Sequence, residues 1–433
     1  MYRNNKSLIY NLKYYLRNSH LHGLRYVGNE KYHITVRILW MIIFSASCFG
    51  MITMFTSLFN NYNENAISFL TETTYLDWNT SFPAVTLCQI SEIDFNLTED
   101  ITGDQDPASL EFFLVDILFF TGTCYSCQTD CKSCSKINLA KVVNKLRKPC
   151  NKLLDTCQWN NFDFNCCEKF LPLETEYGVC FSLNSLHTTP SGKPDPIFMM
   201  NRENGPGKLV INTKEDIRVY YHAPEDVPFI NSESNFRKDI SVGDRYEVLI
   251  KVIEIENDEN VKSLSIEKRE CRFPWEVPDS LKVHKWYSYS TCMVQCHADN
   301  HIRLCNCTHH LMPVYNKQGY CDIDGLNCLT EHFETVNRIH AKGHDKAGLV
   351  CDCLPSCVEP EYTIVSDQKR ADWEGNGITI KMQSLPTSRF KRVVVKSPLD
   401  LVVSIGGAAG LFIGASLITI VEFIYLILFN TKK

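Results

Sequence analysis

Two long runs of apolar residues interrupt a chain in which polar and apolar positions otherwise alternate. The first run, from Ile38 to Phe59, contains no charged residue, and the second, from Leu401 to Phe429, contains one, Glu422. About 20 apolar residues suffice to cross a bilayer. The pattern therefore predicts two membrane-spanning helices rather than two buried helices of a globular protein.

Shorter patterns between the two runs predict a folded domain. Residues 209–222 and 246–256 alternate in the manner of β-strands. Residues 106–120 and 137–148 are predicted to form helices, and the first of these opens with the start signal "DPAS". No tandem repeat is present. We expect one large α+β domain with additional helical segments and with segments that are cross-linked by disulfides.

Charge orients the two predicted spans. Residues 1–37 contain seven lysines and arginines but one acidic residue, Glu30, and the chain ends on two lysines. Because cytosolic flanks carry an excess of basic residues, both termini are expected in the cytosol. A basic group just before the second span disagrees with this orientation; it consists of Arg389, Lys391, Arg392 and Lys396.

Glycosylation sequons and cysteines outweigh that disagreement. Of the 21 cysteines, 20 fall between the two apolar runs, and Cys48 lies in the first. Such usage is typical of an oxidising compartment and allows up to ten disulfides. The middle of the chain is therefore expected outside the cell, in a two-span plasma-membrane protein. Three sequons fall there, at Asn79, Asn96 and Asn306.

Composition and motifs exclude several functional classes. The net charge of −6 argues against a nucleic-acid binder. Two C-x-x-C pairs in residues 124–134 invite a zinc interpretation, but only three residues separate the pairs, so disulfides are favoured. His297 and His301 have helical spacing, yet Ala298 stands where a metalloprotease needs Glu. We therefore expect that the protein is not an enzyme and that it holds no metal and no cofactor.

Five segments carry a family likeness. They are the His-Gly pair at residues 22–23, "FPAVTLC" at 82–88, the "CQWNNFDFNCCEKFLPLETEYGVCFSLN" stretch at 157–184, the cysteine array of 271–357, and "GGAAGLFIGASLITIVEFIYL" at 406–426. Together, and in this order around two spans, they resemble the degenerin / epithelial sodium channel (DEG/ENaC) superfamily, most closely its insect pickpocket-like branch.

The resemblance implies a homo- or heterotrimeric cation channel in the lipid bilayer, usually sodium-selective and often amiloride-sensitive, with a hand-like ectodomain similar to that of acid-sensing channels. Relatives respond to force, osmolarity, chemicals, protons or extracellular ligands, so a sensory role is expected. The implied segments are a cytosolic 1–37, a first span 38–61, an extracellular 62–397 with finger 105–185 and thumb 270–360, a pore helix 398–429, and a cytosolic 430–433.

The second apolar run can also be read as a pore helix from its residues. At 100° per residue, one face of an unbroken helix carries acidic or small residues, and intramembrane carboxylates normally face a cavity or a partner. The glycines beside that face fit close helix packing, which is compatible with a pore role. The predicted pore-lining residues are Asp400, Ser404, Ala408, Leu411 and Glu422.

The resemblance adds roles for particular residues. It implies a selectivity filter at Gly414, Ala415 and Ser416, where the helix would be interrupted, and a gating role for His22 and Gly23. Val403 departs from the small residue usual at its position, where bulk tends to hold channels of the family open, so a gating role is implied for Val403 as well. Ser404 replaces an Asp of proton-gated relatives, which weakens a proton-gating hypothesis. Trp275 fits either a gating contact near the spans or plain core filling.

Three functions are compared. The first is a gated sodium channel subunit, with Na⁺ as the permeant ion. The second is a non-conducting two-span receptor or auxiliary subunit. The third is an ATP-gated trimeric channel, whose basic nucleotide-binding constellation is not recognisable here. The carboxylate in the second apolar run favours the sodium channel subunit, because a helix that only anchors a protein in the membrane needs only apolar residues.

Overall fold

The computed structural model of the chain describes residues 14–64, 66–73, 78–90, 107–128, 138–189, 192–313, 319–339, 348–358, 360–370 and 375–429. The chain divides into two compact units. The first, here the helical unit, comprises Met1–Phe69, Asp258–Arg269 and Arg392–Lys433. The second, here the α+β unit, comprises Leu70–Asn257 and Glu270–Lys391. Each is described by itself.

The first apolar run forms the core of one long helix. Helix α3, Ile34–Glu64, buries none of its residues within the chain and has a mean hydropathy of 2.0 over its most apolar window. It is long and apolar enough to cross a membrane. The predicted helix near the N-terminus is confirmed, and it extends beyond both predicted ends of the span.

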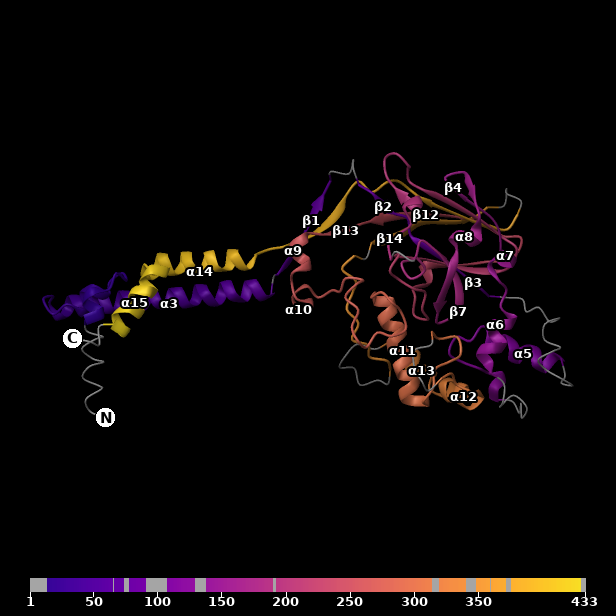
Figure 1. Cartoon of the computed structure of the whole chain (residues 1–433), viewed down its shortest axis with the longest axis horizontal. Helices are drawn as coiled ribbons and strands as arrows, with labels where there is room; N and C mark the ends of the chain where they lie inside the picture. Colours follow the sequence, from indigo (N-terminus) through magenta and orange to yellow (C-terminus); the bar gives the residue numbers. More distant parts are fainter. Residues whose placement is uncertain are drawn as a thin grey trace. The chain divides into compact units, whose positions relative to one another are not determined.

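The second apolar run is broken. Helix α14, Pro398–Ile413, packs against α3 (Figure 1) and is followed after three residues by α15, Leu417–Phe429. The two helices are bent by 67°, and only as a pair do they meet the length and hydropathy expected of a span. The assumption of an unbroken helix was wrong, and the second span stays a prediction. Among its described residues, the helical unit also contains residues 14–18, which are helical, and the short helices α2 (Leu24–Gly28), α9 (Glu259–Lys262) and α10 (Ile266–Arg269).

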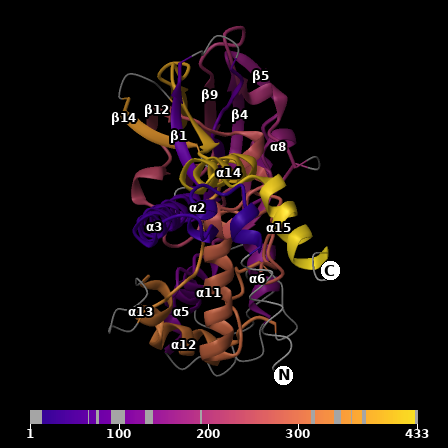
Figure 2. The same ribbon diagram turned by 90° about the vertical axis from the view of Figure 1, so that its left-hand side faces the viewer.

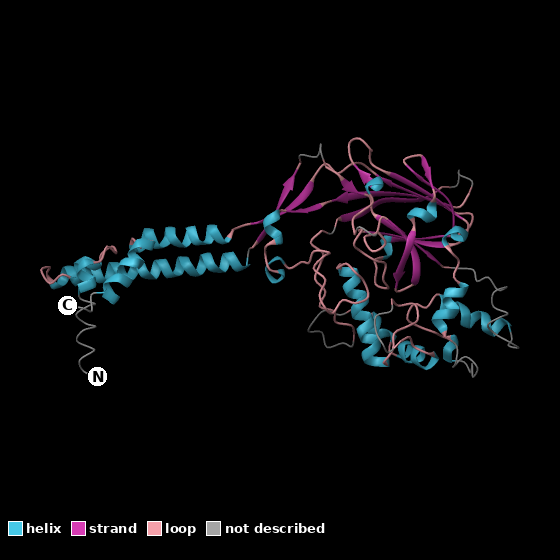
Figure 3. Cartoon of the chain, viewed as in Figure 1, coloured by secondary structure: helices cyan, strands magenta, loops and turns pink. Residues whose placement is uncertain are grey.

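Two sheets pack around one hydrophobic core in the α+β unit (Figure 3). Buried residues of β3 and β10 in one sheet and of β9, β12 and β15 in the other belong to the same cluster. The five-stranded sheet has the order β11 (Arg237–Ile240), β10 (Ile217–His222), β3 (Ala84–Gln89), β7 (Gly178–Leu183), β6 (Leu171–Thr175). The six-stranded sheet has the order β14 (Glu361–Lys369), β12 (Arg245–Ile253), β15 (Gly377–Met382), β9 (Lys208–Thr213), β4 (Leu154–Trp159), β5 (Phe162–Phe164).

Smaller sheets and the predicted strands complete the β structure. The alternating segment 209–222 forms β9 and β10, which belong to different sheets, and 246–256 forms most of β12 together with part of β13. In β10, alternate residues point to one face of the sheet, and those on this face, Ile217, Val219 and Tyr221, all belong to the shared core. The remaining sheets are β1 (Ile67–Glu72), β16 (Arg389–Val394), β13 (Ile255–Asn257), and β2 (Thr80–Ser81) with β8 (Met199–Met200).

The longer helices of the α+β unit gather apart from its two main sheets (Figures 1 and 2), whereas two short ones, α7 and α8, contact β4. The longest, α11 (Tyr289–Cys305), starts at a capping box formed by Ser288 and Thr291. The two predicted helices are confirmed as α5 (Pro107–Leu118) and α6 (Leu139–Leu146), and they share an apolar cluster with α12 (Ile323–Glu331). The others are α7 (Cys150–Leu153), α8 (Cys166–Lys169) and α13 (Phe333–Asn337), with single 3₁₀ turns at Ser126–Gln128, Pro196–Phe198 and Ser234–Phe236.

Nine disulfides join described cysteines, all in the α+β unit. Cys124 bonds to Cys127, which contradicts the zinc alternative for these two residues; Cys131 and Cys134 lie outside the described residues. Cys48 is free. The other bridges are Cys88–Cys180, Cys150–Cys167, Cys157–Cys166, Cys271–Cys357, Cys292–Cys353, Cys296–Cys351, Cys305–Cys328 and Cys307–Cys321.

Candidate ion-conduction site

The break between α14 and α15 begins at Gly414, which adopts the left-handed conformation with a φ of 68°. Its amide donates to the carbonyl of Gly410 at 3.0 Å, which closes the last turn of α14. A Cβ at this position would lie 2.7 Å from Nε2 of His22. Both the backbone conformation and the close approach therefore require glycine.

Helix α15 restarts through a reciprocal cap. The amide of Ser416 donates to Oγ1 of Thr419 at 2.8 Å, and the amide of Thr419 donates to Oγ of Ser416 at 3.3 Å. This satisfies donors that a helix N-terminus leaves without partners. The S-x-x-T spacing was readable in the sequence, but Thr419 was not singled out.

The His-Gly pair lies against this break. The amide of His22 donates to the carbonyl of Ile413 at 3.0 Å, at the end of α14. Gly23 follows with a φ of 84° and precedes α2, and a Cβ there would meet the Trp40 ring at 3.2 Å. Two segments that the sequence places at opposite ends of the chain are thus in direct contact within the helical unit.

A second contact joins the same segments. Nδ1 of His20 lies 2.8 Å from a carboxylate oxygen of Glu422, with side-chain exposures of 76% and 27%. Beside this pair, the rings of Tyr15 and Phe423 meet edge to face at 5.0 Å. No local pattern marks His20 as a contact residue, because a histidine in a basic tail is ordinarily solvated.

The predicted pore-lining residues are not equivalent within one chain. The carboxylate of Asp400 accepts hydrogen bonds from the amide and the hydroxyl of Ser397, at 2.9 and 2.8 Å, and so caps α14. Ala408 is buried, Leu411 is 75% exposed and Ser404 is partly buried. The bend separates Glu422 from these residues of α14. Pore lining stays a prediction for all five.

The remaining predicted residues fall elsewhere. Val403 is exposed on α14, and Trp275, in the α+β unit, is 56% exposed and stacks on Phe273 with ring centroids 4.7 Å apart. Plain core filling is therefore wrong for Trp275, and gating roles for both residues stay predictions. Asn79 and Asn306 are exposed, as glycosylation requires, and Asn96 lies outside the described residues.

Two residues of the basic group before the second span, which conflicted with the predicted orientation, form ion pairs. The guanidinium of Arg389 contacts Glu72 at 2.8 Å and also Glu256, and Lys391 lies 3.3 Å from Glu72. The hydrogen bond from Arg389 lowers the pKa of Glu72, which keeps the carboxylate charged. Two of the four basic residues, Arg389 and Lys391, are therefore held by carboxylates of the α+β unit.

The comparisons with known proteins agree with this arrangement of motifs. The sodium channel protein Nach of Drosophila ananassae is 24% identical, covering 94% of this chain and 84% of its own length. Pickpocket protein 19 of Drosophila melanogaster is 22% identical over 94% of this chain and 88% of its own. The human bile acid-sensitive ion channel is 25% identical over 63% of this chain and 57% of its own.

One solved structure, of a proton-activated chloride channel, aligns with 90% of this chain and 96% of its own at 7% identity and a TM-score of 0.27, too low to bear on fold or ion choice. The family model described as amiloride-sensitive sodium channel matches residues 15–426. This chain therefore belongs to the amiloride-sensitive sodium channel (DEG/ENaC) family, a family of ion channels rather than enzymes.

Proposed function

We propose that the chain is a subunit of a gated, sodium-selective and amiloride-sensitive cation channel in the plasma membrane. In this proposal α3 and the α14–α15 pair are the two spans, both termini are cytosolic, and three subunits, identical or related, surround one pore. The observation that carries it is the break at Gly414 in an otherwise apolar segment, held by His22.

The break suits cation selection for physical reasons. The last carbonyls of a helix carry partial negative charge and lack intrahelical partners. Those of α14 lie at the break, next to Gly414, Ala415 and Ser416, none of which is bulky. Three copies around an axis would form a narrow ring in which backbone oxygens replace part of the hydration shell of an ion.

Relatives support the finer parts of the proposal. Two of them are named sodium channel or pickpocket proteins, and one is named for its response to bile acid. We infer that this subunit conducts Na⁺ in a sensory setting, opened by force, by osmotic change or by an extracellular chemical. An auxiliary subunit that needs a related partner to conduct is the alternative.

Whole-cell recording with sodium and potassium exchange tests the proposal. Ser416→Leu places a bulky side chain at the break and is expected to change the sodium-to-potassium permeability ratio by severalfold. Ser45→Leu, at an exposed position of α3, is the matched control and should leave the ratio unchanged. Unchanged selectivity in a surface-expressed Ser416→Leu channel would count against the filter assignment.

Amiloride and co-expression separate the alternatives. A sodium current blocked by amiloride in cells expressing this chain alone supports a self-sufficient subunit. A current that needs a related subunit, and that still changes its selectivity with Ser416→Leu, supports a heteromeric channel. No current in any combination, despite surface expression, would favour the non-conducting receptor.

A further inference from the structure

A small cavity in the α+β unit lies on the face of β10 that does not enter the shared core. Its volume is about 200 Å³, and its wall includes Arg147, Tyr177, Arg218 and Tyr220. Sites for drug-sized ligands usually have volumes of roughly 300–1,000 Å³. Any molecule that this cavity holds is therefore small.

The alternation of side chains along β10 explains why polar groups meet at this cavity. Every second residue of the strand belongs to the shared core, so Arg218 and Tyr220 point to the opposite face. Tyr220 packs there with Cys88 and Cys180, which are bonded to each other. The strand thus presents one guanidinium and one phenol to the cavity.

The guanidinium of Arg147 carries a charge that no carboxylate neutralises among the described residues. It donates to the carbonyls of Leu118, Tyr177 and Val179, and its Nε has no hydrogen-bond partner. Burial lowers the pKa of Arg147 to about 10, so the group is still a cation at neutral pH. A partly buried charge without a counterion is costly, and an anion bound beside it removes that cost.

The start of β7 fixes this guanidinium in place. Gly178 has a φ of 86°, and a Cβ there would lie 2.9 Å from Cζ of Arg147. Glycine therefore allows the backbone to approach the guanidinium closely. The cation is positioned by backbone carbonyls, which orient it but do not neutralise it.

Tyr220 brings a hydrogen-bond donor to the same cavity. It is 2% exposed, and its Oη has no hydrogen-bond partner among the described residues. Burial raises the pKa of Tyr220, so the hydroxyl keeps its proton. Buried hydroxyls are nearly always hydrogen-bonded, so this one calls for an acceptor. Arg237 lies opposite Tyr220 in the pairing of β10 with β11, and its positive charge favours an anionic acceptor.

Two carboxylates near the cavity already have partners. Asp239 accepts hydrogen bonds from Nε and Nη2 of Arg218, at 2.6 and 2.7 Å. Glu176, in the turn before β7, accepts from the amide of Ile230 at 2.7 Å and lies 2.5 Å from Nδ1 of His297. These carboxylates are therefore engaged elsewhere and leave the charge of the remaining guanidinium groups uncompensated.

Aromatic and aliphatic side chains form another part of the wall. Phe119, Phe120 and Leu311 line the cavity, and Tyr177 stacks on Tyr220 with ring centroids 5.5 Å apart. An apolar wall with a few polar groups is typical of a small-molecule site. A bare inorganic anion would leave the apolar wall without contacts, so the wall favours an anion that has an apolar body.

We propose that the cavity binds a small organic carboxylate with an apolar body, with Arg147 as its counterion and the hydroxyl of Tyr220 as a hydrogen-bond donor. A carboxylate accepts hydrogen bonds at both of its oxygens, which suits a guanidinium and a hydroxyl at the same time. The inference concerns the α+β unit alone and does not rest on the proposed conduction.

Ligand-observed NMR with the full-length protein in detergent micelles tests the cavity. Benzoate is the probe, and benzamide, which has a similar shape without the charge, is its comparison. We expect saturable benzoate binding in the millimolar range or tighter, and benzamide binding at least tenfold weaker. Chloride at the same concentration as benzoate should not displace it.

Tyr220→Phe removes only the hydroxyl and should weaken benzoate binding about tenfold, because a hydrogen bond to a charged group is lost. Thermal unfolding should not change, since Oη has no partner among the described residues. Tyr221→Phe is the matched control. The Tyr221 hydroxyl also has no described partner, but the residue belongs to the shared core on the other face of β10. This variant should bind benzoate as the wild type does.

Arg147→Gln removes the cation and should abolish benzoate binding, and the two tyrosine variants keep the test decisive if it does not fold. Absence of saturable benzoate binding by the wild type would overturn the proposal. So would equal benzoate affinity in the wild type and Tyr220→Phe, equal binding of benzamide and benzoate, or displacement of benzoate by an equal concentration of chloride.

Discussion

The imidazole of His22 occupies the space into which a side chain at Gly414 would project. A hydrogen bond from the His22 amide to Ile413 holds the two segments together. The tail before α3 and the break between α14 and α15 therefore form one structural unit, and a change at either position is expected to act on both.

Gly414→Ala should abolish or strongly reduce the current. A non-glycine residue in the left-handed conformation costs about 1–2 kcal/mol, and the added Cβ would collide with His22. Current normalised to surface protein, in whole-cell recordings with surface biotinylation, measures the effect.

Gly406→Ala is the matched control for that substitution. Gly406 lies in α14, the helix that ends just before Gly414, and a Cβ there would meet no atom within 4 Å. Its current should equal that of the wild type. Equal losses in Gly406→Ala and Gly414→Ala would show that helix propensity, not the His22 contact, governs this segment.

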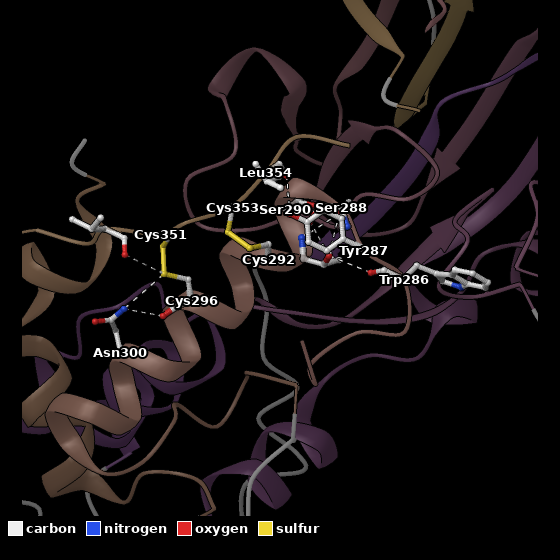
Figure 4. Close-up of a disulfide and its surroundings, with 12 residues drawn as sticks. Trp286, Tyr287, Ser288, Ser290, Cys292, Cys296, Asn300, Cys351, Cys353 and Leu354 are labelled. Atoms are coloured by element: carbon white, nitrogen blue, oxygen red, sulfur yellow. Dashed lines mark hydrogen bonds between the residues drawn. A yellow bond between two sulfur atoms is a disulfide. The ribbon is translucent and has the colours of Figure 1, made fainter. Parts of the chain in front are cut away.

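Two nested disulfides on α11 should protect the fold non-additively (Figure 4). Cys292–Cys353 and Cys296–Cys351 close almost the same loop, with sequence separations of 61 and 55. With one intact, the other closes only a short loop, so each single loss should cost roughly 2 kcal/mol and the double loss about 6 kcal/mol.

Thermal unfolding of the full-length protein in micelles measures these costs, with paired Cys→Ala variants. Cys48→Ala is the control, since Cys48 is free and should be neutral. A double variant whose loss equals the sum of the two single losses would contradict the nested-loop argument.

Glu254 should make stability depend on pH. Burial raises its pKa from 4.5 to about 7, against a lowering contribution from Thr80. A raised pKa in the folded state gives stability that is full below pH 4.5 and is lost as the pH rises through about 7. Because Glu254 is partly exposed, the expected loss is about 2 kcal/mol rather than the full value of the shift.

The Glu254→Gln variant isolates this contribution from that of other groups. Its thermal midpoint should match the wild type near pH 5 and exceed it by a few degrees at pH 8. An identical pH profile in both proteins would show that Glu254 ionises without cost.

Arg147→Lys should destabilise the α+β unit despite keeping the charge. The guanidinium donates to the carbonyls of Leu118 at 2.9 Å, Val179 at 3.2 Å and Tyr177. A lysine ammonium cannot reproduce this planar fork, and each carbonyl left without a donor costs about 1–3 kcal/mol. We expect a loss of roughly 2–4 kcal/mol in the free energy of unfolding.

Arg202→Lys, at an exposed position, is the comparison for Arg147→Lys and should change stability by less than about 0.5 kcal/mol. The measurement is again thermal unfolding in micelles. Full stability in Arg147→Lys would mean that water or the lysine itself satisfies the three carbonyls.

Helices α5 and α6 and the strands β9, β10 and β12 were predictable from the pattern of their own residues, and the apolar helix α3 from the length of a run without charge. The left-handed Gly414 was predictable only in part. The family likeness suggested an interruption there, but nothing in the local sequence gives the size of the bend, 67°.

Pairings across long sequence distances were beyond sequence reasoning. Nothing in the basic tail marks His20 as the partner of Glu422, and nothing near Glu176 marks it as the partner of His297. The nine bridges show the same limit, since the count of cysteines permits many connectivities. Such contacts arise from chain topology, which local periodicity does not encode.

The bridges from Cys292 and Cys296 leave successive turns on one side of α11 and end two residues apart in the chain. A single such bond would act as a pivot, about which the helix could swivel. Two bonds together prevent this rotation, and they also prevent the helix from sliding along its own axis relative to the bonded segment. Helix α11 and the segment that carries Cys351 and Cys353 must consequently move as one rigid body. A force applied to either of them is therefore transmitted to the other.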